Sequence, residues 1–159
     1  MKKYELTENR LEVDDTILFQ IRALRDFDVV HKGDLGGYIE SEKNLSQEGN
    51  SWVSDEACVL GNVRVLDNVC ISDGAKVFGD VQLSGNVRIF ETAWVSGNVC
   101  ISDDVKVGED AWVSGNARLS GSVRILGCSR ISGDSIMSGH FTISGDSRIS
   151  GYTVMYEVE

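Results

Sequence analysis

The chain repeats itself every six residues. From Gly49 to Tyr156 the sequence divides into eighteen consecutive hexads, such as GNVRVL, GNVRIF and GNVCIS, without one insertion or deletion. A fixed short period is typical of solenoid proteins, in which each repeat packs mainly against its neighbours. This period therefore constrains the fold more strongly than any single motif in the chain.

Each position of the hexad has its own chemistry. Position five is Val, Ile, Leu or Met in every hexad, and position three is Ser, Ala, Val or Thr in all but one, where Phe141 stands. Side chains alternate along a strand, so positions three and five point inward and position four points outward. Positions one and two are rich in Gly, Asp and Asn, which tolerate turn geometry. Each hexad is therefore predicted to be a short strand with a corner.

The common polarity and phase of the hexads favour a parallel solenoid over a zigzag of hairpins. Three hexads per coil give a triangular column in which residues eighteen apart become neighbours, at ~4.8 Å between strands. We expect an all-β fold of about six triangular coils over residues 49–156. Residues 1–48 are expected to form a small N-terminal β cap and the coil that leads into the repeats, and residues 157–159 a C-terminal tail.

The repeat resembles that of the hexapeptide-repeat superfamily, in which [Leu/Ile/Val]-x-[Gly/Asp]-[Asn/Asp]-[Ala/Val/Ser]-x recurs. This resemblance implies a left-handed parallel β-helix, although the general rule for parallel crossovers predicts a right-handed one. It also implies side-by-side packing into trimers. The segments IRALRDF from Ile21 and GDLGGYIESE from Gly33 resemble the leader of a bacterial and phage branch that is often labelled as transferases. Such a label follows the fold and says little about chemistry.

Both ends of the column need a cover, because an open coil exposes apolar side chains and unpaired strand edges. Apolar residues alternate with polar ones through the segment 4–27, and Asp14 and Asp15 lie between two such runs, which predicts a short β-hairpin or a three-stranded piece. The predicted plug of the first coil consists of Phe27, Leu35, Tyr38, Ile39 and Leu45. At the other end Phe141 is expected to close the interior, and the last strand, with Tyr152, Met155, Tyr156 and Val158, is a candidate for self-association.

Composition excludes several classes of function. The chain has 25 acidic and 15 basic residues and a net charge of −10, which disfavours direct binding to nucleic acid or anionic membranes. No stretch approaches the ~20 apolar residues of a membrane span, and the first residues are too acidic for a signal peptide. We therefore expect a cytoplasmic protein.

The cysteines indicate neither a disulfide framework nor a metal site. Cys58, Cys70 and Cys100 fall on three different outward columns, and Cys128 lies at a corner. Residues on separate faces of the column are too far apart for disulfides. The sequence contains no CxxC pair and no Cys/His cluster. Reduced thiols, no metal and no cofactor are therefore expected.

Charges separate between the faces and the edges of the predicted column. Every Lys or Arg after Gly49 occupies outward position four, and all twelve acidic residues from Asp55 to Asp146 occupy corner positions one or two. The first outward column holds Trp52, Cys70, Arg88, Lys106, Arg124 and Thr142; the second holds Cys58, Lys76, Trp94, Trp112, Arg130 and Arg148; the third holds Arg64, Gln82, Cys100, Arg118, Ile136 and Val154.

The second column is the candidate binding site. Trp94 and Trp112 are predicted to stack one coil apart, with Lys76 on one side and Arg130 and Arg148 on the other. Such a group could bind an aromatic or anionic ligand by stacking and cation–π contacts. The alternative is a subunit interface, for which Trp and Arg are typical anchors, and the sequence favours this alternative.

Catalysis is the less favoured interpretation. Enzymes of the resembled superfamily are mostly acyltransferases with a histidine base and a loop extruded from the helix. The chain has two histidines, and His140, at a corner of the last coils, is the weak candidate for a base. General-base catalysis needs a positioned partner, and its predicted neighbour Ser122 is a poor orienting group. Recurrent Ser residues at position six fit a structural role.

Three functions follow, in order of preference. The first is a non-catalytic binding or scaffold protein, a phage or prophage accessory factor that forms a homotrimer and blocks a host protein or sequesters a small nucleotide. The second is an acyltransferase that moves an acyl group from acyl-CoA to a small amine or sugar. The third is an acidic DNA mimic, which is weaker because rows of Lys and Arg interrupt the negative surface.

Overall fold

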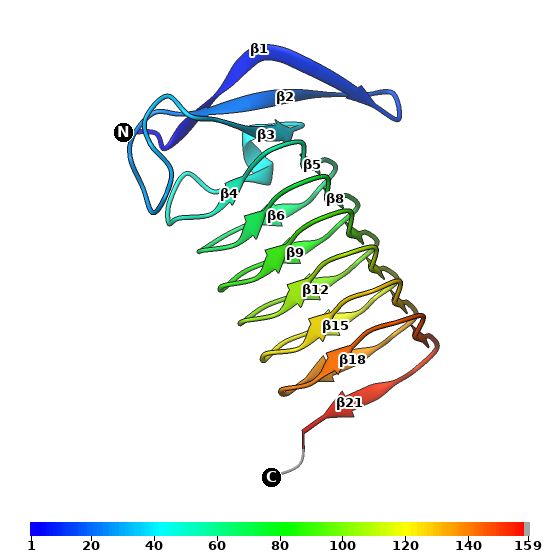
Figure 1. Cartoon of the computed structure of the whole chain (residues 1–159). Helices are drawn as coiled ribbons and strands as arrows, with labels where there is room; N and C mark the ends of the chain where they lie inside the picture. The colour runs from blue at the N-terminus through cyan, green and yellow to red at the C-terminus, as the bar shows by residue number, and fades with distance from the viewer. Residues whose placement is uncertain (158–159) are drawn as a thin grey trace.

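The computed structural model describes residues 1–157 and contains a parallel β-solenoid with a β-hairpin at its N-terminal end (Figure 1). The predicted all-β fold is confirmed, since the described residues contain strands and one short 3-10 helix. No helix within residues 1–157 is both long and apolar enough to cross a membrane. Val158, which the sequence placed in the last strand, lies outside the described residues.

The chain forms three sheets, one on each side of the column. The N-terminal elements are β1 (Tyr4–Val13), β2 (Thr16–Ala23), β3 (Leu35–Ile39) and the 3-10 helix η1 (Glu42–Asn44). The first face comprises β4 (Trp52–Val53), β7 (Cys70–Ile71), β10 (Arg88–Ile89), β13 (Lys106–Val107), β16 (Arg124–Ile125) and β19 (Thr142–Ile143). The second face continues from β3 through β5 (Cys58–Val59), β8 (Lys76–Val77), β11 (Trp94–Val95), β14 (Trp112–Val113), β17 (Arg130–Ile131) and β20 (Arg148–Ile149). The third face comprises β6 (Arg64–Val65), β9 (Gln82–Leu83), β12 (Cys100–Ile101), β15 (Arg118–Leu119), β18 (Ile136–Ser138) and β21 (Val154–Tyr156).

Successive coils stack at a register of eighteen residues. From β4 to β18, each strand pairs in parallel with the strand three places later in the chain, so that Trp94 faces Trp112 and Cys100 faces Arg118. The backbone N–H of Trp94 donates to the carbonyl of Ala111 at 2.9 Å, and equivalent bonds recur from coil to coil. The three predicted outward columns are therefore confirmed. Parallel pairing begins before the regular hexads, because β3 pairs with β5, but Tyr38 is opposite Cys58 and the spacing there is twenty residues.

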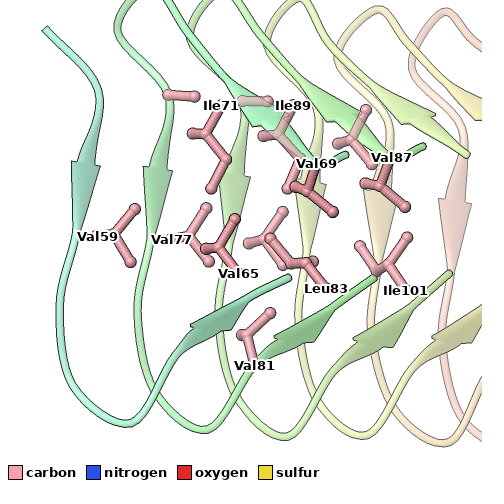
Figure 2. Close-up of a cluster of buried hydrophobic side chains, with 14 of the residues drawn as sticks. Val59, Val65, Val69, Ile71, Val77, Val81, Leu83, Val87, Ile89 and Ile101 are labelled. Atoms are coloured by element: carbon pink, nitrogen blue, oxygen red, sulfur yellow. The ribbon is translucent and has the colours of Figure 1, made fainter. Parts of the chain in front are cut away.

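The interior is a column of stacked aliphatic side chains. Val59 lies beside Val77 on one side, Val65 beside Leu83 on another and Ile71 beside Ile89 on the third (Figure 2). Most residues at hexad positions three and five are buried, as the alternation predicted. Burial falls in the last coils, where Phe141, Ile149 and Met155 are only partly buried against this core. Because similar side chains stack on one another from coil to coil, the cross-section of the column stays the same along its length.

Corner position one requires a left-handed backbone. Its φ is positive at glycines such as Gly97 and at acidic residues such as Asp67 and Asp103. The acidic residues gain a compensating contact, because the carboxylate of Asp103 accepts a hydrogen bond from the backbone N–H of Gly121 in the next coil at 2.9 Å. The Asp67 carboxylate accepts equivalently from Gly85. The alternation of Gly with Asp or Glu at this position thus has a backbone cause.

The hairpin β1–β2 lies across the N-terminal end of the column, as Figure 1 shows. Asp14 and Asp15 form its turn with positive φ, which confirms the predicted hairpin. Of the predicted plug, Phe27, Ile39 and Leu45 are buried and Tyr38 is partly buried. Leu35 is 52% exposed, so its assignment to the plug is wrong. It begins β3 opposite Arg22, and the strand turns inward only after it.

Two residues outside the predicted plug, Trp52 and Tyr4, are buried where the cap meets the column. Trp52, expected to point outward, is only 6% exposed because the cap covers it. Its ring makes edge contacts with Phe27 and Tyr4, at centroid distances of 5.3 and 6.4 Å. A side chain on Gly36 would meet this indole, since a Cβ there would lie 2.7 Å from Trp52 Cζ2. The cap therefore overlaps the start of the first face.

A buried lysine fastens the cap to the column. The ammonium of Lys3 donates to the carbonyls of Glu48 and Ser51 and to the Ser51 hydroxyl, and it lies 5.2 Å from the Phe27 ring centroid. Burial, with a smaller contribution from Arg25, lowers the pKa of Lys3 to about 8. Its three N–H groups are all used, which explains why this charge is tolerated inside.

The stacking of corners generates the first prediction. A Cβ on Gly115, where φ is +73°, would lie 2.6 Å from the backbone N and O of Gly133, whereas one on Gly145, at φ +69°, would have no atom within 4 Å. Both Ala substitutions incur left-handed strain, on the order of 1–2 kcal/mol. We expect Gly115→Ala to lower the thermal midpoint by several degrees more than Gly145→Ala, because only the former also forces adjacent coils apart.

An aspartate at the same place tests whether a hydrogen bond to the next coil offsets the strain and crowding. Gly115→Asp is expected to be less destabilising than Gly115→Ala, because its carboxylate can accept the Gly133 N–H as Asp103 does for Gly121. Circular dichroism melting of the three variants measures this order. Equal losses for Gly115→Ala and Gly145→Ala would contradict the stacking of corners.

Candidate functional site

The two tryptophans of the second face form the centre of a continuous stack. The rings of Trp94 and Trp112 are parallel to within 3°, with centroids 4.8 Å apart. Lys76 Nζ lies 5.3 Å from the Trp94 centroid, and the Arg130 guanidinium carbon lies 4.6 Å from a Trp112 ring centroid. We call these four residues, from consecutive coils β8, β11, β14 and β17, the aromatic ladder.

Each indole face of the aromatic ladder is already covered. Trp94 lies between Lys76 and Trp112, and Trp112 lies between Trp94 and Arg130. Arg130 is held there by hydrogen bonds from Nη1 to the carbonyls of Asp110 and Cys128, at 3.0 and 3.1 Å. Trp112 nevertheless remains 42% exposed. The ladder therefore presents ring edges and cations to a partner, and it leaves no open aromatic face on which a planar ligand could stack.

Arg148 continues the column but not the stack. Its backbone pairs with that of Arg130, and its side chain is exposed. Among the described contacts it makes no cation–π interaction with the tryptophans. The structure thus brings four of the five predicted site residues into mutual contact in series and places the fifth one coil further.

The two histidines lie outside the aromatic ladder and differ in their surroundings. His140 is exposed at the corner before β19, and its backbone N–H, not its imidazole, donates to the Glu157 carboxylate at 3.0 Å. His31 lies in the loop of the cap, with Nδ1 3.9 Å from an Asp34 carboxylate oxygen. Both side chains are open to solvent, and in residues 1–157 the imidazole of His140 has no hydrogen-bonding partner.

The acidic corners are unequal. The edge that precedes the second face, which we call the acidic edge, holds seven of the twelve acidic residues noted above: Asp55, Glu56, Asp73, Glu91, Glu109, Asp110 and Asp146. It therefore runs parallel to the column of Lys76, Arg130 and Arg148. A strongly negative edge beside a positively charged aromatic face gives the molecule complementary surfaces of similar length.

A groove on the first face was not predicted from the sequence. It has a volume of about 510 Å³ and is bounded by the cap loop at Asp28, by Cys70, Arg88 and Lys106 on the face, and by a row of corner side chains. That row consists of Asn68, Asn86 and Asp104, linked by hydrogen bonds of 3.1 Å. Burial raises the pKa of the Cys70 thiol, and Asp28 adds to this against the opposing effect of Arg88.

The sequence predicted the cations of this groove but not the loop that bounds it. The spacing of eighteen placed Arg88 and Lys106 in one column, but the loop that overhangs them lies outside the repeat and has no periodicity to locate it. The four cysteines are free and lie apart. Within residues 1–157 no three His, Cys, Asp or Glu side chains group as a metal site.

Comparison with known proteins gives one informative similarity. No family model matches the chain. The chain is 38% identical to the uncharacterized acetyltransferase YdcK of Escherichia coli (strain K12) over 80 residues. The parallel coils, which stack at eighteen residues, and the similarity to this relative point to the same superfamily. Both are consistent with the hexapeptide-repeat superfamily.

The similarity is partial in both proteins. The aligned region covers 41% of this chain and 24% of the relative. Most of the relative thus has no counterpart in the alignment. The fold is supported by this comparison, and the activity named for the relative belongs to that protein.

Proposed function

We propose that this chain is a non-catalytic binding protein that assembles as a homotrimer through its second face. The observation that carries the proposal is the aromatic ladder, an ordered and partly exposed group of two tryptophans and two cations. Trp and Arg are the residues that contribute most to protein interfaces. Because the indole faces are covered, a flat protein surface suits the ladder better than a stacked nucleotide.

The complementary charges of the acidic edge and the second face support a second copy of the chain as the partner. The acidic edge of one copy can lie along the cationic second face of the next, and both features repeat at the same spacing along the column. An edge-to-face contact that runs in one direction from each copy to the next closes as a ring. Three copies around one axis are the smallest such ring. The first and third faces then remain available for the target that the sequence suggests, a host protein or a small nucleotide.

Mass in solution tests this assembly. We expect sedimentation velocity to give three chain masses for the native protein and one for the double variant Trp94→Ala/Trp112→Ala, with unchanged circular dichroism. Arg64→Ala/Arg118→Ala, on the third face, is the matched control and is expected to remain trimeric. A monomeric native chain, or a tryptophan variant that keeps its mass, would exclude the aromatic ladder as the interface.

Acetyl transfer is the second candidate, favoured by the name of the relative alone. An acetyltransferase would release thiol from acetyl-CoA in the presence of small amines or sugars, and His140→Ala would reduce this release at least tenfold. The non-catalytic proposal instead predicts no turnover above the uncatalysed rate. Turnover by the native chain that His140→Ala removes would overturn the non-catalytic proposal.

A further inference from the structure

We propose that the groove on the first face binds a small organic anion that has an apolar part. Its oxyanion group lies on Arg88 and Lys106, and its apolar part lies under the cap loop beside Trp52. This inference does not depend on the trimer, because it concerns a different face of the column. It rests on three features: unpaired cations, a fixed wall and an apolar end.

The cations of the first face lack the partners that those of the second face have. Arg88, Lys106 and Arg124 stand on consecutive paired strands, about 4.8 Å apart. No ion pair or side-chain hydrogen bond within residues 1–157 uses their charged groups. On the second face Lys76 and Arg130 lie on indole rings instead. Like charges on adjacent strands repel, so a bound anion relieves a repulsion built into the sheet.

The loop over this row is fixed before any ligand arrives. The Asp26 carboxylate accepts the Lys32 N–H at 2.7 Å, and the Asp34 carboxylate accepts the His31 N–H at 2.9 Å. Phe27 and Val30 exchange two backbone hydrogen bonds, and the Phe27 ring packs on Trp52. A wall that is ordered in the free protein lowers the entropic cost of binding.

The end of the groove beneath this loop is apolar. A contiguous hollow of about 330 Å³ shares Cys70 with the groove and is bounded by Val29, Leu35 and Trp52. Val29 is 79% exposed at this end of the groove. Apolar surface next to a cation pair fits a ligand that has both characters, since pockets of this kind combine apolar walls with a few polar anchors.

Three carboxylates line the groove and its apolar end, and they affect it differently. Asp34 lines the apolar end, and its carboxylate accepts the His31 N–H. Asp104 is occupied by the Asn86 amide, which donates to it at 3.1 Å. Asp28 lies on the loop between the apolar end and the cations. The Asp28 carboxylate repels the anionic group of a ligand but does not repel its apolar part. Its replacement therefore gives a prediction of opposite sign to that for the cations.

Titration calorimetry with inorganic phosphate, phenyl phosphate and benzoate tests the site. We expect phenyl phosphate to bind at one site per chain and more tightly than inorganic phosphate. Arg88→Ala/Lys106→Ala is expected to weaken phenyl phosphate at least tenfold, and Asp28→Asn to strengthen it a few-fold. The control Arg64→Ala/Arg118→Ala, which removes the same net charge from the third face, is expected to change it less than twofold. The comparison of phenyl phosphate with benzoate identifies the preferred oxyanion.

Alkylation of cysteine locates the ligand independently. Iodoacetamide labelling at pH 8.5, read by peptide mass spectrometry, is expected to slow several-fold at Cys70 when phenyl phosphate is bound and to be unchanged at Cys128. The absence of binding by all three probes would overturn the proposal. So would equal losses in the first-face and third-face variants, weaker binding by Asp28→Asn, or a change of oligomeric state in Arg88→Ala/Lys106→Ala, which would make this face a contact between copies.

Discussion

The parallel hydrogen-bond ladder between coils is the constraint on which every other feature depends. Each coil donates to and accepts from residues one coil away, so an insertion of one residue within a strand would shift its register and send its inward side chains to the surface. The eighteen hexads contain no insertion. This uniform length explains why side chains that are eighteen apart in sequence meet in rows, and why a change at one position acts through its neighbours above and below.

The rows give the three faces different chemistry although their backbones are alike. On the second face, tryptophans separate the cations and take up their charges by cation–π contact. On the first face, cations follow one another with no aromatic ring between them, and the cap covers the start of the row. The acidic corners stabilise the backbone of the next coil while giving one edge a strong negative charge. Structure and recognition therefore use the same side chains.

The repeat allowed most of the column to be predicted. The alternation in residues 4–27 predicted the hairpin of the cap, but not how the cap contacts the column. Position alternation was enough to place Trp94 over Trp112, because strand register follows from the period alone. It could not show that Lys76 and Arg130 cover the outer indole faces, which depends on side-chain conformation. Trp52 and Leu35 exchanged their expected environments because the hairpin lies across the first coil. Lys3 at the interface of cap and column carried no signal, since a single lysine near a terminus is ordinarily exposed.

Disulfide trapping measures the register directly. Gln82 and Cys100 are paired on adjacent strands of the third face, at a separation that suits a disulfide. In a chain whose Cys58, Cys70 and Cys128 are replaced by Ser, Gln82→Cys is expected to close an intrachain bridge to Cys100 under mild oxidation. Asp80→Cys, two residues out of phase, is expected to leave both thiols free. Bridge formation by Asp80→Cys and not by Gln82→Cys would contradict the eighteen-residue stacking.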